Sequence, residues 1–208
     1  YLNLGEIEIR NSENVSQGTY RSYQLAVGVS YGYRVSDRLG LGTSVRGVYS
    51  KLSESTNQIS DGTASTIAGD LSVLYRTSPF SLGGSKATFS TGMNLANMGG
   101  RLQYNQAKEP LPMNLRFGYA LTVDFDEYNT LTLANDFNKE LVSVDRQVAD
   151  GDTSFVADPF YEALFSSWGP ARGEQGVNDT ATLSVIEQFT VGAGLEYWYS
   201  DLFALRTG

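Results

Sequence analysis

The chain has 208 residues with a formal net charge of −8, and it contains neither cysteine nor histidine. Without these residues it cannot form disulfides, thiolate metal sites, or the Ser-His-Asp and Cys-His arrangements of nucleophilic enzymes. No run of Lys and Arg forms the basic patch that nucleic-acid binding requires, so we expect no nucleic-acid partner.

The composition favours strands joined by tight turns, because 12% of the residues are aromatic and 22 glycines stand against five prolines. No apolar run approaches the roughly 20 residues of a membrane-spanning helix. We therefore expect an all-β fold.

The first clear strand covers residues 23–33, YQLAVGVSYGY. Its odd positions are Tyr, Leu or Val, and its even positions are small or polar, which is typical of a strand with one apolar face. The pattern predicts about nine strands, many of them near the roughly 9 to 11 residues that cross a bilayer when tilted. With an ambiguous first strand included, they fall at residues 1–10, 23–33, 39–52, 67–76, 88–95, 114–124, 130–138, 185–199 and from 203 onward.

The face opposite the apolar one carries small residues and charges. The charges could line a water-filled or ligand passage, or they could pair across neighbouring strands and fill the interior, and we favour pairing. The charged residues on this face are Arg34, Arg46, Asp70, Arg76, Arg116, Asp124, Glu196 and Arg206.

The predicted connections alternate in length along the chain, as they do between the periplasmic turns and extracellular loops of outer-membrane barrels. Short turns fall at 35–38, 77–86, 125–129 and 200–201, and longer loops at 11–21, 53–64, 97–113 and 140–182. Aromatic residues near both kinds of connection fit two interfacial girdles. These are Tyr33, Tyr75, Trp198 and Tyr199 near short turns, and Tyr23 and Tyr49 near long loops.

These patterns predict a transmembrane antiparallel β-barrel of a bacterial outer membrane. A soluble antiparallel barrel or sandwich with its apolar face inward is the alternative. Both ends of the chain fall within strand-like sequence, so we expect residues 1–208 to form part of a single barrel, with a long extracellular loop at about 140–182.

That long loop gathers apolar side chains in a polar setting, and it exceeds the length of an ordinary connection. The i, i+4, i+5 spacing of Phe160, Leu164 and Phe165 predicts a short helix that presents them together. We predict a docking surface for protein partners, with a helix that packs onto the barrel mouth as the equal alternative. The predicted partner-contact residues are Phe155, Phe160, Tyr161, Leu164, Phe165 and Trp168.

Four segments, in order, resemble the PorV (LptO) family of the type IX secretion system. They are MNLANMGGRLQY, LPMNLRFGYAL, DEYNTLTLANDFNKELV and LEYWYSDLFALRTG, beginning at residues 93, 111, 126 and 195. The loop FVADPFYEALFSSWGPARG, from residue 155, is similar to the short amphipathic helical stretch of an extracellular loop in that family.

The resemblance implies a FadL-like barrel of 14 strands, of which this chain covers a middle portion, in the cell outer membrane and in contact with its lipid. It also implies a non-enzymatic shuttle with no catalytic residue, cofactor or metal. Such a shuttle receives cargo with a type IX C-terminal signal domain from a SprA/Sov-type translocon and passes it to a PorU-type attachment complex.

Two other functions stay open from the sequence. A FadL-like transporter of hydrophobic small molecules needs an apolar interior pocket, and the inward positions are mostly small and polar. A purely structural barrel that braces another channel is the third possibility.

Overall fold

The computed structural model describes the chain except for residues 54–61, 105–106, 150–151 and 173–181. For residues 107, 145–149, 152–155, 171–172 and 182 it describes the backbone alone. Within the described ranges, no helix is long and apolar enough to cross a membrane.

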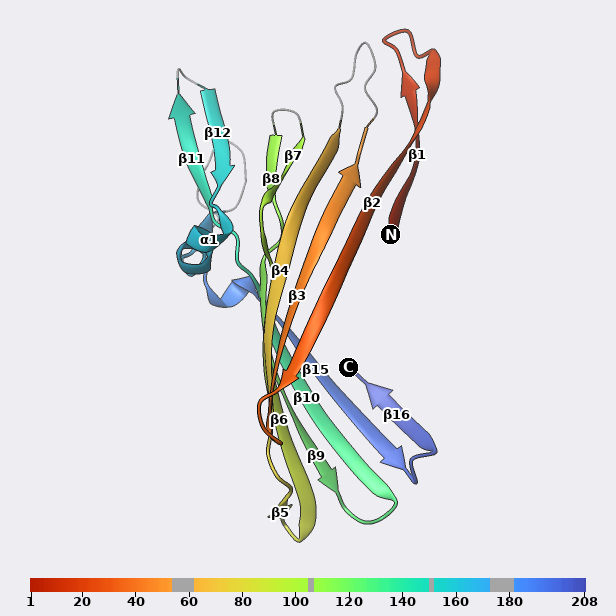
Figure 1. Cartoon of the computed structure of the whole chain (residues 1–208), viewed down its shortest axis with the longest axis vertical. Coiled ribbons are helices and arrows are strands. Elements are labelled where there is room, and N and C mark those ends of the chain that lie inside the picture. The colour runs from red at the N-terminus through yellow and green to blue at the C-terminus, as the bar shows by residue number, and fades with distance from the viewer. Residues whose placement is uncertain (54–61, 105–106, 150–151, 173–181) are drawn as a thin grey trace.

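One antiparallel sheet dominates the fold, and nine of its strands follow one another in chain order across it (Figure 1). The short strand β5 (Phe80–Leu82) pairs with β6 beside this path, and β1 and β16 are the two edges. The nine strands are β1 (Leu2–Arg10), β2 (Ser16–Arg34), β3 (Leu39–Lys51), β4 (Thr63–Arg76), β6 (Ser85–Gly99), β9 (Asn114–Asp124), β10 (Asn129–Glu140), β15 (Phe189–Tyr199) and β16 (Phe203–Thr207).

The remaining elements lie in the connections at the upper end of the sheet in Figure 1. They form three small hairpin sheets and two short helices. The hairpins are β7 (Arg101–Tyr104) with β8 (Ala107–Pro110), β11 (Val144–Ala149) with β12 (Asp152–Ala157), and β13 (Ala171–Arg172) with β14 (Thr182–Leu183); the helices are α1 (Phe160–Ser166) and the 3-10 turn η1 (Ile186–Gln188).

The strand register confirms that the alternating pattern separates two faces. Val29 lies opposite Val45, and further along the sheet Met93, Phe117 and Phe137 form a continuous row. We call this side the apolar face and the other side the polar face. The apolar face carries the odd-numbered residues of the long strands from Tyr23 onward, and in β6 this holds up to Leu95. Past the register shift in β6 the parity reverses, so that Met98 lies on the apolar face. The all-β antiparallel architecture predicted for a β-barrel is thus confirmed.

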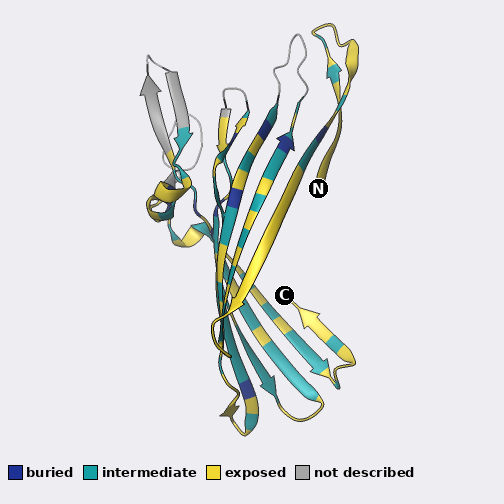
Figure 2. Cartoon of the chain, viewed as in Figure 1, coloured by how far each residue is buried: buried dark blue, intermediate teal, exposed yellow. Residues whose placement is uncertain are grey.

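Because the sheet is a single layer, most of its residues are not buried. Figure 2 shows buried residues scattered along the strands, with long exposed stretches on β2. Large apolar side chains such as Val29, 77% exposed, stand on the apolar face without a covering layer. A side chain of this kind needs an apolar medium or partner to leave water.

The connections differ between the two ends of the sheet. Tight turns join β2 to β3, β9 to β10 and β15 to β16, whereas the opposite end carries the hairpins and α1 (Figure 1). The prediction of a loop at residues 11–21 was wrong, because β2 begins at Ser16. Pairing with β1, including the 2.7 Å ion pair between Arg21 and Glu6, keeps this polar stretch extended.

Trp198 was predicted to belong to an aromatic girdle, which requires the apolar face, but it lies on the polar face. It pairs with Thr130 and Ala204 in the register, so it belongs to the polar face. Its indole N–H donates to Glu196 at 2.6 Å, and the Arg206 guanidinium lies 5.1 Å from its ring centroid. Trp198 therefore packs among charges of the polar face, whereas its neighbours Tyr197 and Tyr199 occupy the apolar face.

Candidate functional site

The helix α1 forms inside the long connection between β10 and β15. Pro159, in extended conformation, precedes it, and its carbonyl accepts the N–H groups of Glu162 and Ala163. The Ser166 hydroxyl donates to Asp158 at 2.6 Å and to the Glu162 carbonyl at 3.1 Å. The bond from Glu162 satisfies one of the N–H groups that the first turn of a helix otherwise leaves open.

One side of α1 packs against the apolar face of the sheet. Ala163 is 3% exposed and forms a buried cluster with Met113 and Leu141. Because Leu95 and Leu115, which pack against this cluster, belong to the apolar face, α1 lies on the apolar side of the sheet and not across its polar face. The partly buried residues packed against this cluster are Leu95, Met98, Leu115 and Leu164.

The opposite side of α1 is exposed. Phe165 is 82% exposed and Tyr161 57% exposed. Both lie roughly half a helical turn from Ala163, since successive helical residues are about 100° apart. In Figure 1, α1 lies on one side of the sheet and the edge strands β1 and β16 lie on the other. The two exposed rings therefore point sideways, away from the sheet.

The residues predicted to contact partners therefore do not all lie on one exposed surface. The expected helix is present, but it does not present Phe160, Leu164 and Phe165 together, because Leu164 packs on the buried cluster and Phe165 faces away. Phe160 is partly exposed and meets Tyr161 edge-on, with ring centroids 5.6 Å apart. The backbone of Phe155 belongs to β12, and its side chain lies outside the described residues.

Trp168 lies just beyond the helix and turns back toward the sheet. Its indole N–H donates to the Leu164 carbonyl at 2.8 Å. Its ring packs against Phe189 of β15, with ring centroids 6.4 Å apart. Trp168 therefore holds the end of α1 against the apolar face, while 44% of its surface stays exposed.

The long connection is tied to the neighbouring hairpin as well. The Arg101 guanidinium donates to the Ala157 carbonyl, and the Asp158 N–H donates to the Ser143 carbonyl at 2.9 Å. These bonds fix both chain segments that enter and leave the β11–β12 hairpin. The exposed surface made by Tyr161 and Phe165, which we call the aromatic surface, thus rests on an anchored support.

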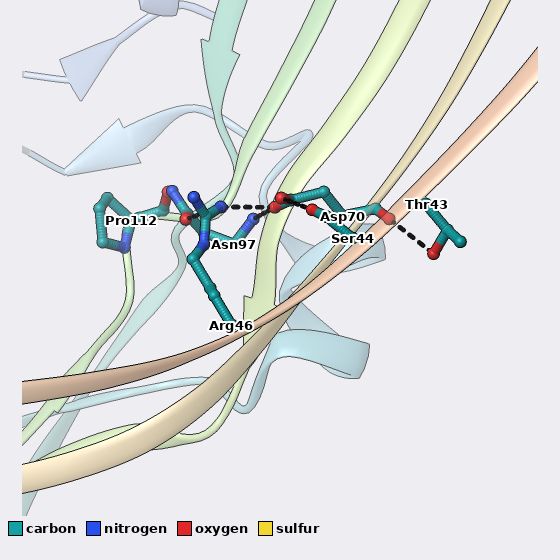
Figure 3. Close-up of polar contacts among 6 residues, drawn as sticks. All are labelled: Thr43, Ser44, Arg46, Asp70, Asn97 and Pro112. Atoms are coloured by element: carbon teal, nitrogen blue, oxygen red, sulfur yellow. Dashed lines mark hydrogen bonds and ion pairs between the residues drawn. The ribbon is translucent and has the colours of Figure 1, made fainter. Parts of the chain in front are cut away.

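A polar network occupies the opposite face of the sheet (Figure 3). Asp70 accepts from the Arg46 guanidinium at 2.6 Å, from the Ser44 hydroxyl and from the Asn97 backbone N–H at 2.8 Å. Arg46 also donates to the Asn97 side chain at 2.8 Å, and the Asn97 amide donates to the Pro112 carbonyl at 2.8 Å. The network joins β3, β4, β6 and the segment that leads into β9.

These contacts support the interpretation that charges on the polar face pair with one another. Arg206 forms a second pair with Glu196, between β16 and β15. Arg76 instead donates to the Ser90 hydroxyl at 3.2 Å, and Asp124 accepts from Thr130 at 2.9 Å. The arrangement provides hydrogen-bonding groups on the polar face.

The sequence patterns did not indicate one residue that contacts the connection around α1. Lys139 lies on the apolar face beside Trp168 and Phe189 and is completely buried. Its position shares the odd parity of Phe137, so the alternating pattern already placed a cation where an apolar residue was expected. That irregularity was the available signal.

A sheet that is apolar on one face and polar on the other, with tight turns at one end and elaborate connections at the other, defines the class of antiparallel β-barrel proteins. Comparison with curated proteins finds no match to this chain. The family model described as type IX secretion system protein PorV matches residues 1–147, more than half of the chain, which therefore belongs to the PorV family.

Membership assigns the chain to the type IX secretion machinery and confirms the resemblance inferred from the sequence motifs. The matched residues include every strand of the sheet up to β10. They end before α1, so the aromatic surface rests on this chain's own structure and not on the family match.

Proposed function

We propose that the protein is an outer-membrane shuttle of the type IX secretion system. In this role it binds a SprA/Sov-type translocon, receives cargo with a C-terminal signal domain, and hands the cargo to a PorU-type attachment complex. The observation that carries the proposal is the aromatic surface, held on the outer side of the sheet with Tyr161 and Phe165 exposed.

The dimensions of the apolar face support a membrane location. Tyr23 and Tyr33 bound this face on β2 and are ten residues apart, or roughly 33 Å along the strand at about 3.3 Å per residue. A strand tilt of about 40° reduces the height to roughly 25 Å, the height of the apolar band in outer-membrane barrels. Above Tyr23, Arg21 and Glu6 form an ion pair that suits an aqueous setting.

The direction of the aromatic surface favours a lateral partner. Because α1 packs on the apolar face, Phe165 and Tyr161 point along the plane of the membrane and not upward from the barrel mouth. A neighbouring barrel can meet them there, whereas a soluble cargo domain above the mouth cannot. We therefore assign this surface to the translocon and expect cargo to bind elsewhere on the extracellular side.

Exposed aromatic rings are effective anchors in protein interfaces, because each buries a large apolar area with little loss of side-chain entropy. The proposal is tested with Phe165→Ser in the full-length protein, using pull-down from solubilised outer membranes. We expect recovery of the translocon to fall about tenfold or more, as for loss of an interface anchor.

The matched control is Phe125→Ser, which removes an exposed ring from the turn at the other end of the sheet. Both variants should keep heat-modifiable migration on gels, the sign of an intact barrel. Unchanged translocon recovery with Phe165→Ser would contradict the docking role. Recovery of bound fatty acid without a protein partner would instead support the FadL-like transporter.

A further inference from the structure

The long connection is held to the sheet by a buried lysine. Lys139 of β10 has no exposed surface, and its ammonium donates to the Gln188 side-chain carbonyl at 2.5 Å and to the Glu140 carbonyl at 3.4 Å. Two aromatic rings cover it, with centroids 5.7 Å (Trp168) and 6.0 Å (Phe189) from the nitrogen. We call this arrangement the lysine cage.

The cage joins parts of the chain that are far apart in sequence. Trp168 lies 29 positions after Lys139, and Gln188 lies 49 positions after it. The Gln188 amide also donates to the Gly169 carbonyl at 2.9 Å and to the Leu183 carbonyl at 3.3 Å. Lys139 therefore fastens the segment that follows α1 and the segment that enters β15 to one point on β10.

A charged residue is energetically unfavourable at this buried position. Removing an ammonium from water is unfavourable unless hydrogen bonds and nearby rings replace its hydration. A leucine or methionine would fill the space without that cost. The ammonium favours one arrangement of the connection, because only that arrangement satisfies both its hydrogen bond to Gln188 and its contact with the two rings.

We infer that Lys139 is the positioning residue of the aromatic surface. By fixing Trp168, whose indole is bonded to the Leu164 carbonyl, the cage sets how α1 sits on the apolar face and hence where Phe165 points. The inference rests on the proposed function, since it concerns how the docking surface is held in place for the translocon.

The test uses Lys139→Met in the full-length protein, in a Trp198→Phe background that leaves Trp168 as the only tryptophan in this sequence. Methionine keeps the apolar stem and removes the ammonium. We expect Trp168 emission to shift to the red with greater acrylamide quenching, and translocon recovery to fall about tenfold, as for loss of a charged hydrogen bond. Lys139→Arg keeps the cation and should restore both readings.

The matched control is Lys86→Met, which changes an exposed lysine at the other end of the sheet. Should Lys139→Met fail to form a heat-modifiable barrel, Gln188→Ala removes the hydrogen-bond acceptor and is read in the same two ways.

The inference is overturned if Trp168 emission does not change, or if it changes while translocon recovery stays at the wild-type level. Those results leave the proposed function standing when Phe165→Ser still abolishes recovery. Normal recovery with Phe165→Ser removes the docking role itself, and this inference with it.

Discussion

The carboxylate of Asp70 accepts the backbone N–H of Asn97 at 2.8 Å, at the position where the ladder between β4 and β6 is interrupted. Gly69 pairs with Met98 and Leu71 with Leu95, so Asp70 lies at the register shift. Asn97 has a positive φ of 61°, a conformation that asparagine tolerates better than most residues. A side chain thus replaces a strand bond that the bulge removes.

Removing the Asp70 carboxylate should destabilise the sheet. Asp70→Ala leaves the Arg46 guanidinium and the Asn97 N–H without this acceptor on the polar face. We expect a loss of about 2 kcal/mol in the free energy of unfolding, measured by urea titration in detergent micelles. Asp37→Ala breaks the exposed ion pair with Arg34 and should cost no more than about 0.5 kcal/mol. Equal losses would count against the network as a stabilising centre.

Two glycines of the sheet, Gly99 on β6 and Gly47 on β3, should respond differently to alanine. A Cβ at Gly99 would overlap the Ile67 carbonyl oxygen and lie 2.9 Å from the Ala68 Cα, so Gly99→Ala must move backbone. At Gly47 the nearest atom would be 4.0 Å away. We expect a loss of about 1–3 kcal/mol for Gly99→Ala, as for overpacking, and little change for Gly47→Ala. The same urea titration decides, and the reverse order would refute the packing described for β4 and β6.

The assignment of the two faces can be tested with adjacent residues. Val29 and Ser30 lie near the middle of the apolar stretch of β2 from Tyr23 to Tyr33, the first on the apolar face and the second on the polar face. Val29→Lys should cost about 2–4 kcal/mol for folding into lipid vesicles, the range for a cation near the bilayer midplane. Ser30→Lys, on the interior side, should fold nearly as well as the wild type. Similar costs for both would contradict a lipid-facing apolar side.

The turn between β9 and β10 should make stability depend on acid. The Tyr128 N–H, followed by the Asn129 side chain and backbone, donates to Asp126 and lowers the pKa of that carboxyl below its ordinary value. A lowered folded-state pKa means that the stabilisation is present above the unfolded pKa, about 4, and is lost as pH falls through the folded value.

We therefore expect the urea midpoint of the wild type to fall between pH 7 and about pH 3. Asp126→Asn should show a smaller drop, because its side chain does not titrate. Glu127→Gln changes a neighbouring carboxyl that takes no part in these bonds and should keep the wild-type drop. An equal drop in all three proteins would exclude Asp126 as the source.

The alternation of residues in β2 was enough to predict a strand, its two faces and the placement of Val29 and Ser30, because side-chain direction in a strand repeats every two residues. The motifs from residue 93 onward were likewise enough to predict the PorV family, which the match to residues 1–147 confirms. Even the position of Trp198 on the polar face follows from parity, although its aromatic character suggested a girdle.

Other features depended on contacts between distant segments. Residues 16–21 look like a loop until pairing with β1 makes them strand, since the backbone bonds come from another part of the chain. The pairing of Arg46 with Asp70 and the enclosure of Lys139 by Trp168 join residues 24 and 29 positions apart. The sequence by itself determined the class of fold and its two faces, because period two is local. Only the tertiary structure decided which charges pair and which way α1 faces, because those choices depend on packing against a sheet that the distant strands build together.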